Sequence, residues 1–153
     1  MSRPRGRARE SVDTDRSHTR SFPARMSALR EVAAFIAEMC AAAGFVRGAC
    51  LKLTLLVEEL FANTITHGYK QDSEAPVRLA FEVRAGRIAL TYEDTAPPYD
   101  PFVGVTPPDA ATTVEDRLVG GLGILLVSSM AKDVEYRRVD GKNRIALVVT
   151  APE

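Results

Sequence analysis

The spacing of apolar residues predicts two helices in the first half of the chain. Between residues 23 and 43, apolar positions recur at steps of three and four, which is the period of an amphipathic helix. They are Met26, Leu29, Val32, Ala33, Ile36, Ala37 and Cys40. Gly44 follows them and is expected to end this helix. A second, more apolar helix is predicted from about residue 48 to residue 67, with Gly68 just past its end.

The pattern then changes to alternation, which predicts strands. Residues 77–84 (VRLAFEVR) and 87–93 (RIALTYE) alternate apolar with polar positions on either side of Ala85-Gly86. Two alternating segments separated by two such residues predict an antiparallel hairpin.

The rest of the chain combines a loop, a helix and a second hairpin. Five prolines fall within residues 96–108. Proline disfavours both helices and interior strands, so a long loop is expected there. Residues 120–130 predict a glycine turn that leads into a third helix. Residues 132–139 and 143–150 predict another hairpin around an Asp-Gly turn.

This order of elements predicts an α+β fold. Two helices, two strands, a long loop, a third helix and two strands would make a two-layer α/β sandwich, with one mostly antiparallel sheet and helices on a single face. A doubly wound parallel sheet would instead alternate strands with helices.

The composition fits one globular domain, which we assign to residues 21–153. The chain has 153 residues, of which 46% are hydrophobic, enough for one core and too few for two full domains. Residues 1–20 carry six arginines against three acids and lack leucine, isoleucine, phenylalanine and tyrosine. We therefore expect a disordered N-terminal tail, whose arginines could alternatively contact an acidic partner.

Charge and hydropathy disfavour several classes of protein. A formal net charge of zero gives no general attraction to nucleic acid or to an anionic membrane. The first residues contain no apolar signal segment, and no apolar run approaches membrane-spanning length. We expect a cytoplasmic protein that binds neither nucleic acid nor membrane. Cys40 and Cys50 form no CxxC motif, so we expect two reduced thiols without a metal.

A polar stripe on the second predicted helix is a candidate for chemistry. Glu59, Asn63 and His67 are spaced by four residues and share one edge of the buried face, whereas Glu58 points away. A carboxylate can accept a proton from a nucleophile, and an amide oxygen can bind Mg²⁺. By itself, such a spacing is more often a solvated helix edge. A histidine in the last turn of a helix is also favoured simply by the helix dipole.

Two further segments could bind a nucleotide. Asp94 lies where a strand gives way to the proline-rich loop, and it could accept a hydrogen bond from an exocyclic amine such as that of adenine. The commoner alternative is a turn-forming aspartate. Gly120, Gly121 and Gly123 precede an apolar helical run, and such glycines let a backbone approach phosphate oxygens. The segment is neither a P-loop nor a dinucleotide fingerprint, and a glycine turn without a ligand is an equal alternative.

Together and in this order, the three segments resemble the N, G1 and G2 boxes of the GHKL superfamily. More closely, EELFANTITHGY, EDTAPPYDPF and VGGLGILLV resemble the small anti-sigma factor serine kinases of bacterial partner-switching systems, the RsbW/SpoIIAB-like family. The resemblance covers about residues 22–150 and implies the Bergerat ATP-binding fold, with ATP and Mg²⁺ as ligands.

The resemblance also implies a role for each matching residue. Glu59 would be the catalytic base, Asn63 the Mg²⁺ ligand and Asp94 the acid that binds adenine. Residues 99–119 would form an ATP lid, expected to be mobile because its prolines leave few ladder hydrogen bonds. The remaining nucleotide contacts would be His67, Ala96, Pro98, Gly120, Gly121, Leu122, Gly123 and Ile124.

Two residues depart from the pattern of the family. Ala96 stands where the G1 box usually has glycine, so the loop is expected to sit differently around the base, although alanine is small enough for the site to close. Leu125 stands where many close relatives have histidine, so a polar contact made there would be absent.

The resemblance implies a protein serine kinase that phosphorylates a STAS-domain antagonist, sequesters a sigma factor and forms a homodimer. A nucleotide-dependent regulatory binding module with little or no kinase activity is the alternative. A domain that never binds nucleotide is a third possibility. Glu59 favours the enzyme, because a pure binding module has no need of a base.

Overall fold

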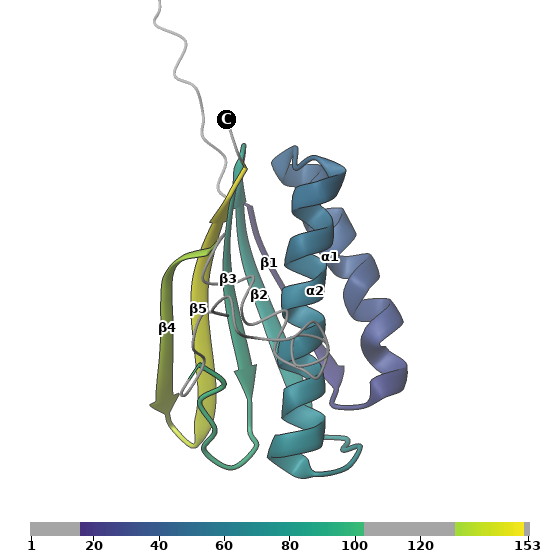
Figure 1. Ribbon diagram of the computed structural model, residues 1–153, viewed down its shortest axis with the longest axis vertical. Helices are drawn as coiled ribbons and strands as arrows, with labels where there is room; N and C mark the ends of the chain where they lie inside the picture. Colours follow the sequence, from purple (N-terminus) through teal and green to yellow (C-terminus); the bar gives the residue numbers. More distant parts are fainter. Residues whose placement is uncertain (1–15, 103–130, 152–153) are drawn as a thin grey trace, which may run out of the picture.

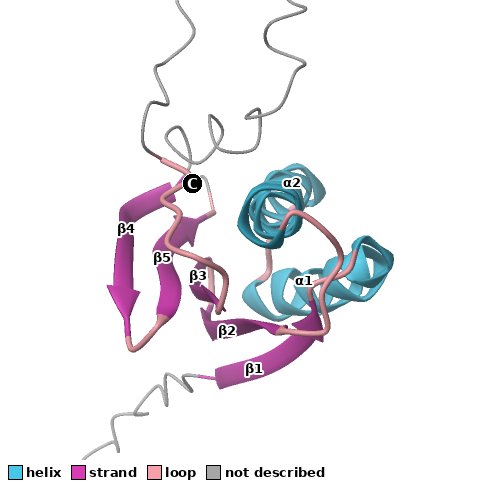
Figure 2. Cartoon of the chain, turned by 90° about the horizontal axis from the view of Figure 1, so that it is seen from below, coloured by secondary structure: helices cyan, strands magenta, loops and turns pink. Residues whose placement is uncertain are grey.

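In the part of the chain that the structure describes, a five-stranded antiparallel sheet carries two helices on one face (Figures 1 and 2). The computed structural model describes residues 16–102 and 131–151. The strand order in the sheet is β1-β2-β3-β5-β4. The elements are β1 (Arg16–Pro23), a 3-10 turn (Met26–Ala28), α1 (Leu29–Ala43), α2 (Arg47–Asn63), β2 (Pro76–Arg84), β3 (Arg87–Asp94), β4 (Ala131–Val139) and β5 (Lys142–Thr150). The α+β sandwich is confirmed, while the helix predicted at residues 120–130 lies outside the described residues.

The first predicted helix is present, but its buried face differs from the predicted one. Gly44 caps α1 as expected, with φ of +71° and its N–H donating to the carbonyls of Cys40 and Ala41. Met26 and Ala37, which belonged to the predicted apolar stripe, are exposed. The buried residues of α1 are Val32, Phe35, Ile36, Met39, Cys40 and Ala43. This stripe is turned around the helix relative to the predicted one, so that α1 packs on both the sheet and α2.

The second helix ends differently from its prediction. α2 buries Ala49, Leu53, Leu56, Val57, Leu60 and Phe61. Gly68 does not cap it, because the chain continues into a π-helical turn, η2 (Thr64–Tyr69), which ends at Lys70 with φ of +62°. Gly68 therefore lies buried inside this turn. Glycine is required there because a side chain would not fit, and not because the backbone is left-handed. Among the described residues, no helix is long and apolar enough to cross a membrane.

The two predicted hairpins pair in the expected way, and β3 and β5 lie side by side. Alternation along β2, β3 and β5 sends one set of side chains into the core against the helices. These residues are Val77, Leu79, Phe81, Val83, Ile88, Leu90, Tyr92, Ile145, Leu147 and Val149. The pattern continues to the ends of β3 and β5, where the core-facing positions are polar: Asp94 lies opposite Asn143.

Strand β1 was not predicted, and it corrects the boundary of the expected tail. Residues 16–20 were assigned to the tail, but they pair with β2 from Arg16 opposite Val83 to Pro23 opposite Pro76. Only Phe22 of this strand is buried, so its sequence lacks the apolar alternation that identifies strands. Backbone pairing with the edge of β2 forms the strand instead. The other residues of the expected tail lie outside those described.

Candidate nucleotide site

The candidate site is built around the Asp94 carboxylate at the end of β3. Its Oδ1 atom accepts hydrogen bonds from the Ala96 N–H at 3.1 Å and from Nδ2 of Asn143 at 2.8 Å. Its Oδ2 atom accepts a hydrogen bond from the Thr64 hydroxyl at 2.7 Å. Asp94 is only 6% exposed, so these donors compensate the loss of water around its charge. The carboxylate thus joins three segments that are distant in sequence.

Tyr92 fastens the end of α2 to the sheet beneath this carboxylate. Its hydroxyl lies 2.6 Å from the Thr64 hydroxyl oxygen and donates to the Leu60 carbonyl at 3.1 Å. Burial raises the pKa of Tyr92 well above its ordinary value, the Asp94 charge raises it further, and the Thr64 hydrogen bond lowers it. Tyr92 therefore remains a neutral phenol that can donate a hydrogen bond.

Asn143 organises the loop that follows Asp94. Beyond its bond to the carboxylate, its Nδ2 reaches the Ala96 carbonyl at 3.2 Å and the Pro97 carbonyl at 3.1 Å. Its Oδ1 accepts hydrogen bonds from the Tyr99 N–H at 3.2 Å and from the Tyr136 hydroxyl at 2.5 Å. One buried amide thus ties the first turn of the loop to two strands.

Asn143 was not among the predicted site residues, although its position in β5 is a signal for it. The residue occupies a core-facing position of a strand whose next core-facing residues are Ile145, Leu147 and Val149. A buried amide in such a series needs hydrogen-bond partners, and the neighbouring strand supplies Asp94. Arg138 was also missed; its guanidinium donates to the Ala96 carbonyl at 2.7 Å.

The structure brings some of the predicted site residues together. Asn63 lines a small cavity between α2 and the sheet, of about 10 Å³, together with Asp94, Tyr99 and Asn143. Glu59 lies one turn earlier on the same helix edge and is half-buried. In residues 16–102 and 131–151, no hydrogen bond or ion pair engages the side chain of Glu59 or Asn63.

Other predicted contacts lie at the margin or beyond the described residues. His67 is exposed, and its ring stacks on Tyr99 with centroids 5.8 Å apart and planes at 22°. Pro98 is exposed. The glycine loop predicted to hold phosphates, Gly120, Gly121, Leu122, Gly123 and Ile124, lies outside the described residues, as do Leu125 and most of the expected lid.

Ala96, the departure from the G1 pattern, packs directly against Gly68. Ala96 is 1% exposed, and a Cβ atom built on Gly68 would lie 2.8 Å from the Ala96 Cβ. Such a distance is shorter than a real carbon contact, so one methyl group fits between η2 and the loop, but not two. The alanine is accommodated because its neighbour is glycine.

This contact predicts a compensating pair of substitutions. Gly68→Ala is expected to lower the free energy of unfolding by about 1–3 kcal/mol and the melting temperature by about 3–10 °C, as overpacking does. Adding Ala96→Gly should restore most of this loss, because it removes the opposing methyl group. Calorimetry on the two single variants and the double variant measures the coupling. Strictly additive changes would show that the two residues do not oppose each other.

Comparison with known proteins identifies the family of this domain. Residues 22–149 match the model of the histidine kinase-like ATPase domain. The chain belongs to this family. It is similar to the serine/threonine-protein kinase BtrW of Bordetella bronchiseptica, with 29% identity over 102 residues, covering 66% of this chain and 71% of that protein.

A solved structure supports the fold of this ATPase domain. It contains the RsbU and RsbW domains of Rv1364c from Mycobacterium tuberculosis and superposes with a TM-score of 0.59, at 16% identity over 90% of this chain. The chain spans 33% of that protein's chain. These matches confirm the resemblance to RsbW-like GHKL kinases that the sequence predicted.

Proposed function

We propose that this ATPase domain is a protein serine kinase of a partner-switching system. In this proposal it transfers the γ-phosphate of ATP to a serine of a STAS-domain antagonist, sequesters a sigma factor and acts as a homodimer in the cytoplasm. The observation that carries the nucleotide site is the meeting of Asn63 and Asp94, from α2 and the end of β3, at one cavity. The similarity to a serine/threonine kinase supports the reaction type.

Asp94 is suited to bind the adenine amine. Three hydrogen bonds hold its carboxylate in place, and two carboxylate oxygens offer about four acceptor sites in total, so one more donor can be accepted. An exocyclic N–H₂ group is such a donor, whereas a carbonyl oxygen at the same place would be repelled by the charge. The site therefore favours adenine over guanine.

Base binding requires the loop above the cavity to move. The described cavity, at about 10 Å³, has room for one water and no more. Tyr99 lines it and is held by two weak restraints, the stacking on His67 and one N–H bond to Asn143. We infer that Tyr99 and its neighbours swing away when the base enters, while the Asp94 and Thr64 pair remains.

Asn63 and Glu59 would act on the phosphate side of the nucleotide. The Asn63 amide oxygen is a hard ligand that fits Mg²⁺, which supplies charge neutralisation for the phosphates when bound. Glu59, one helical turn away, is placed to orient the incoming serine hydroxyl and to take its proton. A half-buried carboxylate without a competing partner among the described residues suits this role.

The test is direct phosphoryl transfer. With Mg²⁺ and γ-labelled ATP, the chain should label a cognate STAS protein on serine, and mass spectrometry should locate one phosphoserine. A STAS protein with that serine changed to alanine is the control and should stay unlabelled. If nucleotide binds but no phosphoserine forms, the chain is a nucleotide-dependent binding module instead.

A further inference from the structure

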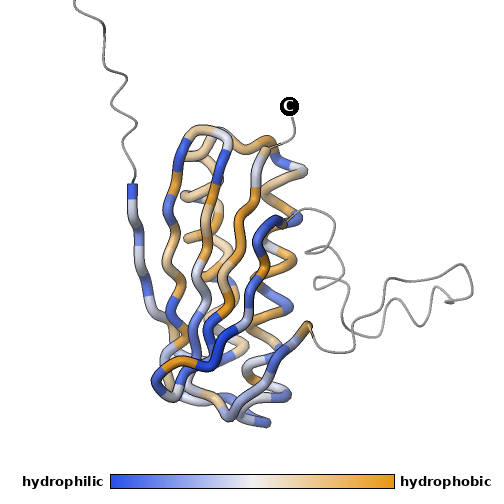
Figure 3. Tube along the Cα trace, turned by 90° about the vertical axis from the view of Figure 1, so that its left-hand side faces the viewer, coloured by the Kyte–Doolittle hydropathy of each residue, from blue (hydrophilic) through white to orange (hydrophobic). Residues whose placement is uncertain are grey.

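The face of the sheet opposite the helices carries an ordered row of charges. Arg78 of β2, Glu93 of β3, Arg144 of β5 and Arg137 of β4 lie directly opposite one another across four strands. We call these four residues the arginine row. Figure 3 looks onto this face, where hydrophilic stretches gather toward the lower end of the sheet. Figure 2 shows that both helices cover the other face.

Glu93 at the centre of the row is fully engaged with its neighbours. Its Oε1 lies 2.6 Å from Nε of Arg144, and its Oε2 lies 3.6 Å from a terminal nitrogen of Arg78. The Glu93 side chain is only 6% exposed. Its negative charge is therefore compensated by the arginines of the row and is little exposed to a partner.

The arginines of the row, in contrast, keep donors that face solvent. The side chains of Arg78, Arg144 and Arg137 are 47%, 40% and 65% exposed, and each guanidinium carries five N–H donors, of which these ion pairs occupy few. Lys142 is a fourth exposed cation beside them. Glu135, which accepts from Nε of Arg137 at 2.7 Å, is the second carboxylate of the area. Asp94 lies at the edge of this area as a third carboxylate, so four cations against three carboxylates leave it positive by one charge in a chain whose net charge is zero.

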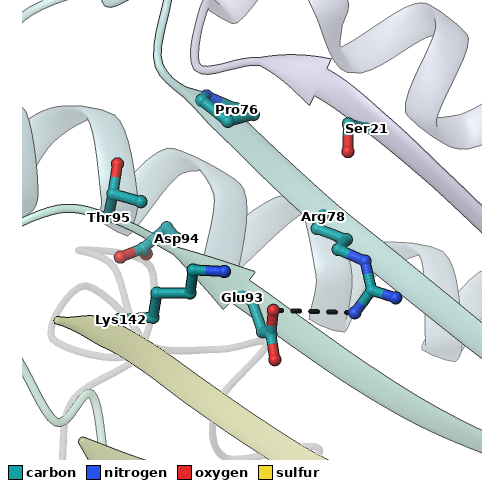
Figure 4. Close-up of a pocket in the computed structure, with 7 residues that line it drawn as sticks. All are labelled: Ser21, Pro76, Arg78, Glu93, Asp94, Thr95 and Lys142. Atoms are coloured by element: carbon teal, nitrogen blue, oxygen red, sulfur yellow. Dashed lines mark ion pairs between the residues drawn. The ribbon is translucent and has the colours of Figure 1, made fainter. Parts of the chain in front are cut away.

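A shallow pocket at the end of the row gives the surface a defined shape. It has a volume of about 80 Å³ and is lined by Ser21, Pro76, Arg78, Glu93, Asp94, Thr95 and Lys142. Figure 4 shows Arg78 and Lys142 approaching from opposite sides of Glu93. An acidic side chain entering here would meet the exposed cations of Lys142 and Arg78. The two carboxylates of the lining are buried and already engaged, Glu93 with Arg78 and Arg144, and Asp94 with Thr64, Ala96 and Asn143.

The row of residues next to these charges is small, so a partner can approach the sheet closely. Thr19, Ala80, Thr91 and Ala146 lie opposite one another on the same face. With such short side chains, the neighbouring arginines stand above their surroundings. Arginine is enriched in protein interfaces because its planar group binds carboxylates with two parallel hydrogen bonds.

We propose that this face of the sheet docks an acidic segment of a protein partner, with an aspartate or glutamate seated in the pocket between Arg78 and Lys142. A protein fits better than a nucleic acid, because the exposed Glu135 carboxylate interrupts the positive surface and the chain has no net positive charge to attract a phosphate backbone. The docking does not require the proposed phosphoryl transfer, since the row lies on the face that the helices leave open, although Asp94 lines both this pocket and the cavity of the nucleotide site.

The test measures binding of a short fluorescein-labelled peptide of alternating glutamate and serine. Binding is measured by fluorescence anisotropy at low and at physiological salt. The wild-type chain should bind this peptide, and Arg137→Glu with Lys142→Glu should weaken binding about tenfold or more. The matched control is Arg30→Glu with Arg47→Glu, which changes the net charge equally on exposed positions of the two helices. It should weaken binding less than about twofold.

A charge-neutral double variant and chemical-shift mapping complete the test. Arg137→Gln with Lys142→Gln should weaken binding without introducing repulsion, and thermal melts confirm that each variant folds. Amide chemical-shift changes on peptide addition should cluster around Ala80, Thr91 and Ala146. The proposal is overturned if the control pair weakens binding as much as the row pair, if the shifts map to the helices, or if oligothymidylate binds more tightly than the peptide. If the wild-type chain shows no phosphoryl transfer, the peptide-binding result still stands, because the two proposals are tested by separate measurements.

Discussion

Replacing Asp94 by asparagine is expected to lower the affinity for ATP about 10- to 100-fold, because a hydrogen bond to a charged group is worth about 1.5–3 kcal/mol. The carboxylate is acceptor-only, and its oxygens already accept from Ala96, Asn143 and Thr64. An amide here would turn an N–H₂ group toward one of these donors or toward the adenine amine. Titration with a fluorescent ATP analogue, confirmed by competition with ATP, measures the change.

Asp140→Asn is the matched control for this variant. Asp140 is exposed in the turn between β4 and β5 with φ of +50°, a conformation that asparagine also tolerates. The charge change is the same, but ATP affinity should stay within about twofold of wild type. Melting curves separate loss of binding from loss of folding. If Asp94→Asn binds ATP as well as the control does, the Asp94 carboxylate does not contact the base.

Glu59→Gln is expected to reduce phosphoryl transfer to the STAS protein about 10²- to 10⁴-fold, the usual contribution of a general base. Glutamine keeps the shape of the side chain but cannot take the proton of the serine hydroxyl. Nucleotide affinity should change little, because Asp94 and Asn63 are assigned the binding contacts. Single-turnover kinetics with γ-labelled ATP, beside equilibrium binding on the same preparation, distinguishes the two effects.

Glu58→Gln serves as the control, since Glu58 is the preceding residue and points about 100° away around the same helix. Both acids are half-buried, so the two substitutions disturb packing to a similar degree. Glu58→Gln should retain near wild-type transfer. Equal losses in the two variants would argue for a general effect of charge on α2, and full activity of Glu59→Gln would remove Glu59 from the mechanism.

Periodicity explains why so much of the fold was predictable. The stripe of Leu53, Leu56, Val57 and Leu60 and the alternation in β2 and β3 each repeat over several turns or pairs, so local sequence agrees with the final packing. Where packing is not local, the predictions fail. The face of α1 is set by contacts to both α2 and the sheet, and β1 is formed by backbone pairing with β2. The observed face of α1 is as periodic as the predicted one, so spacing alone does not choose between them, and the pairing of β1 leaves no apolar alternation on its own segment.

The site shows the same division between local and cross-strand information. Asn63 and Asp94, which line one cavity, were predicted for the site because helix spacing and a strand end are local signals. Asn143 was not found, because its role depends on the register that places it opposite Asp94. Gly68 was predicted as a cap, but its function is to leave room for Ala96, a contact between residues far apart in sequence. The contact between Asn143 and Asp94 is predictable if the polar core-facing residues at the ends of adjacent predicted strands are paired.

Buried polar groups at the site also suggest how it keeps its shape while the loop moves. Thr64, Tyr92 and Asp94 are joined by hydrogen bonds between the start of η2 and the end of β3, and Tyr92 also bonds the Leu60 carbonyl of α2. Among the described residues, Tyr99 is tied by one N–H bond and one ring contact. We therefore expect the first group to stay in place and Tyr99 to move when a base binds.

Titration of the wild-type chain with a fluorescent ATP analogue, with and without Mg²⁺, tests the central claim most directly. We predict that the analogue binds saturably and that unlabelled ATP displaces it, whereas GTP displaces it poorly. Mg²⁺ should raise the affinity of the wild type for the analogue but not that of Asn63→Ala. A folded wild-type chain that shows no saturable binding at any soluble nucleotide concentration would contradict the account.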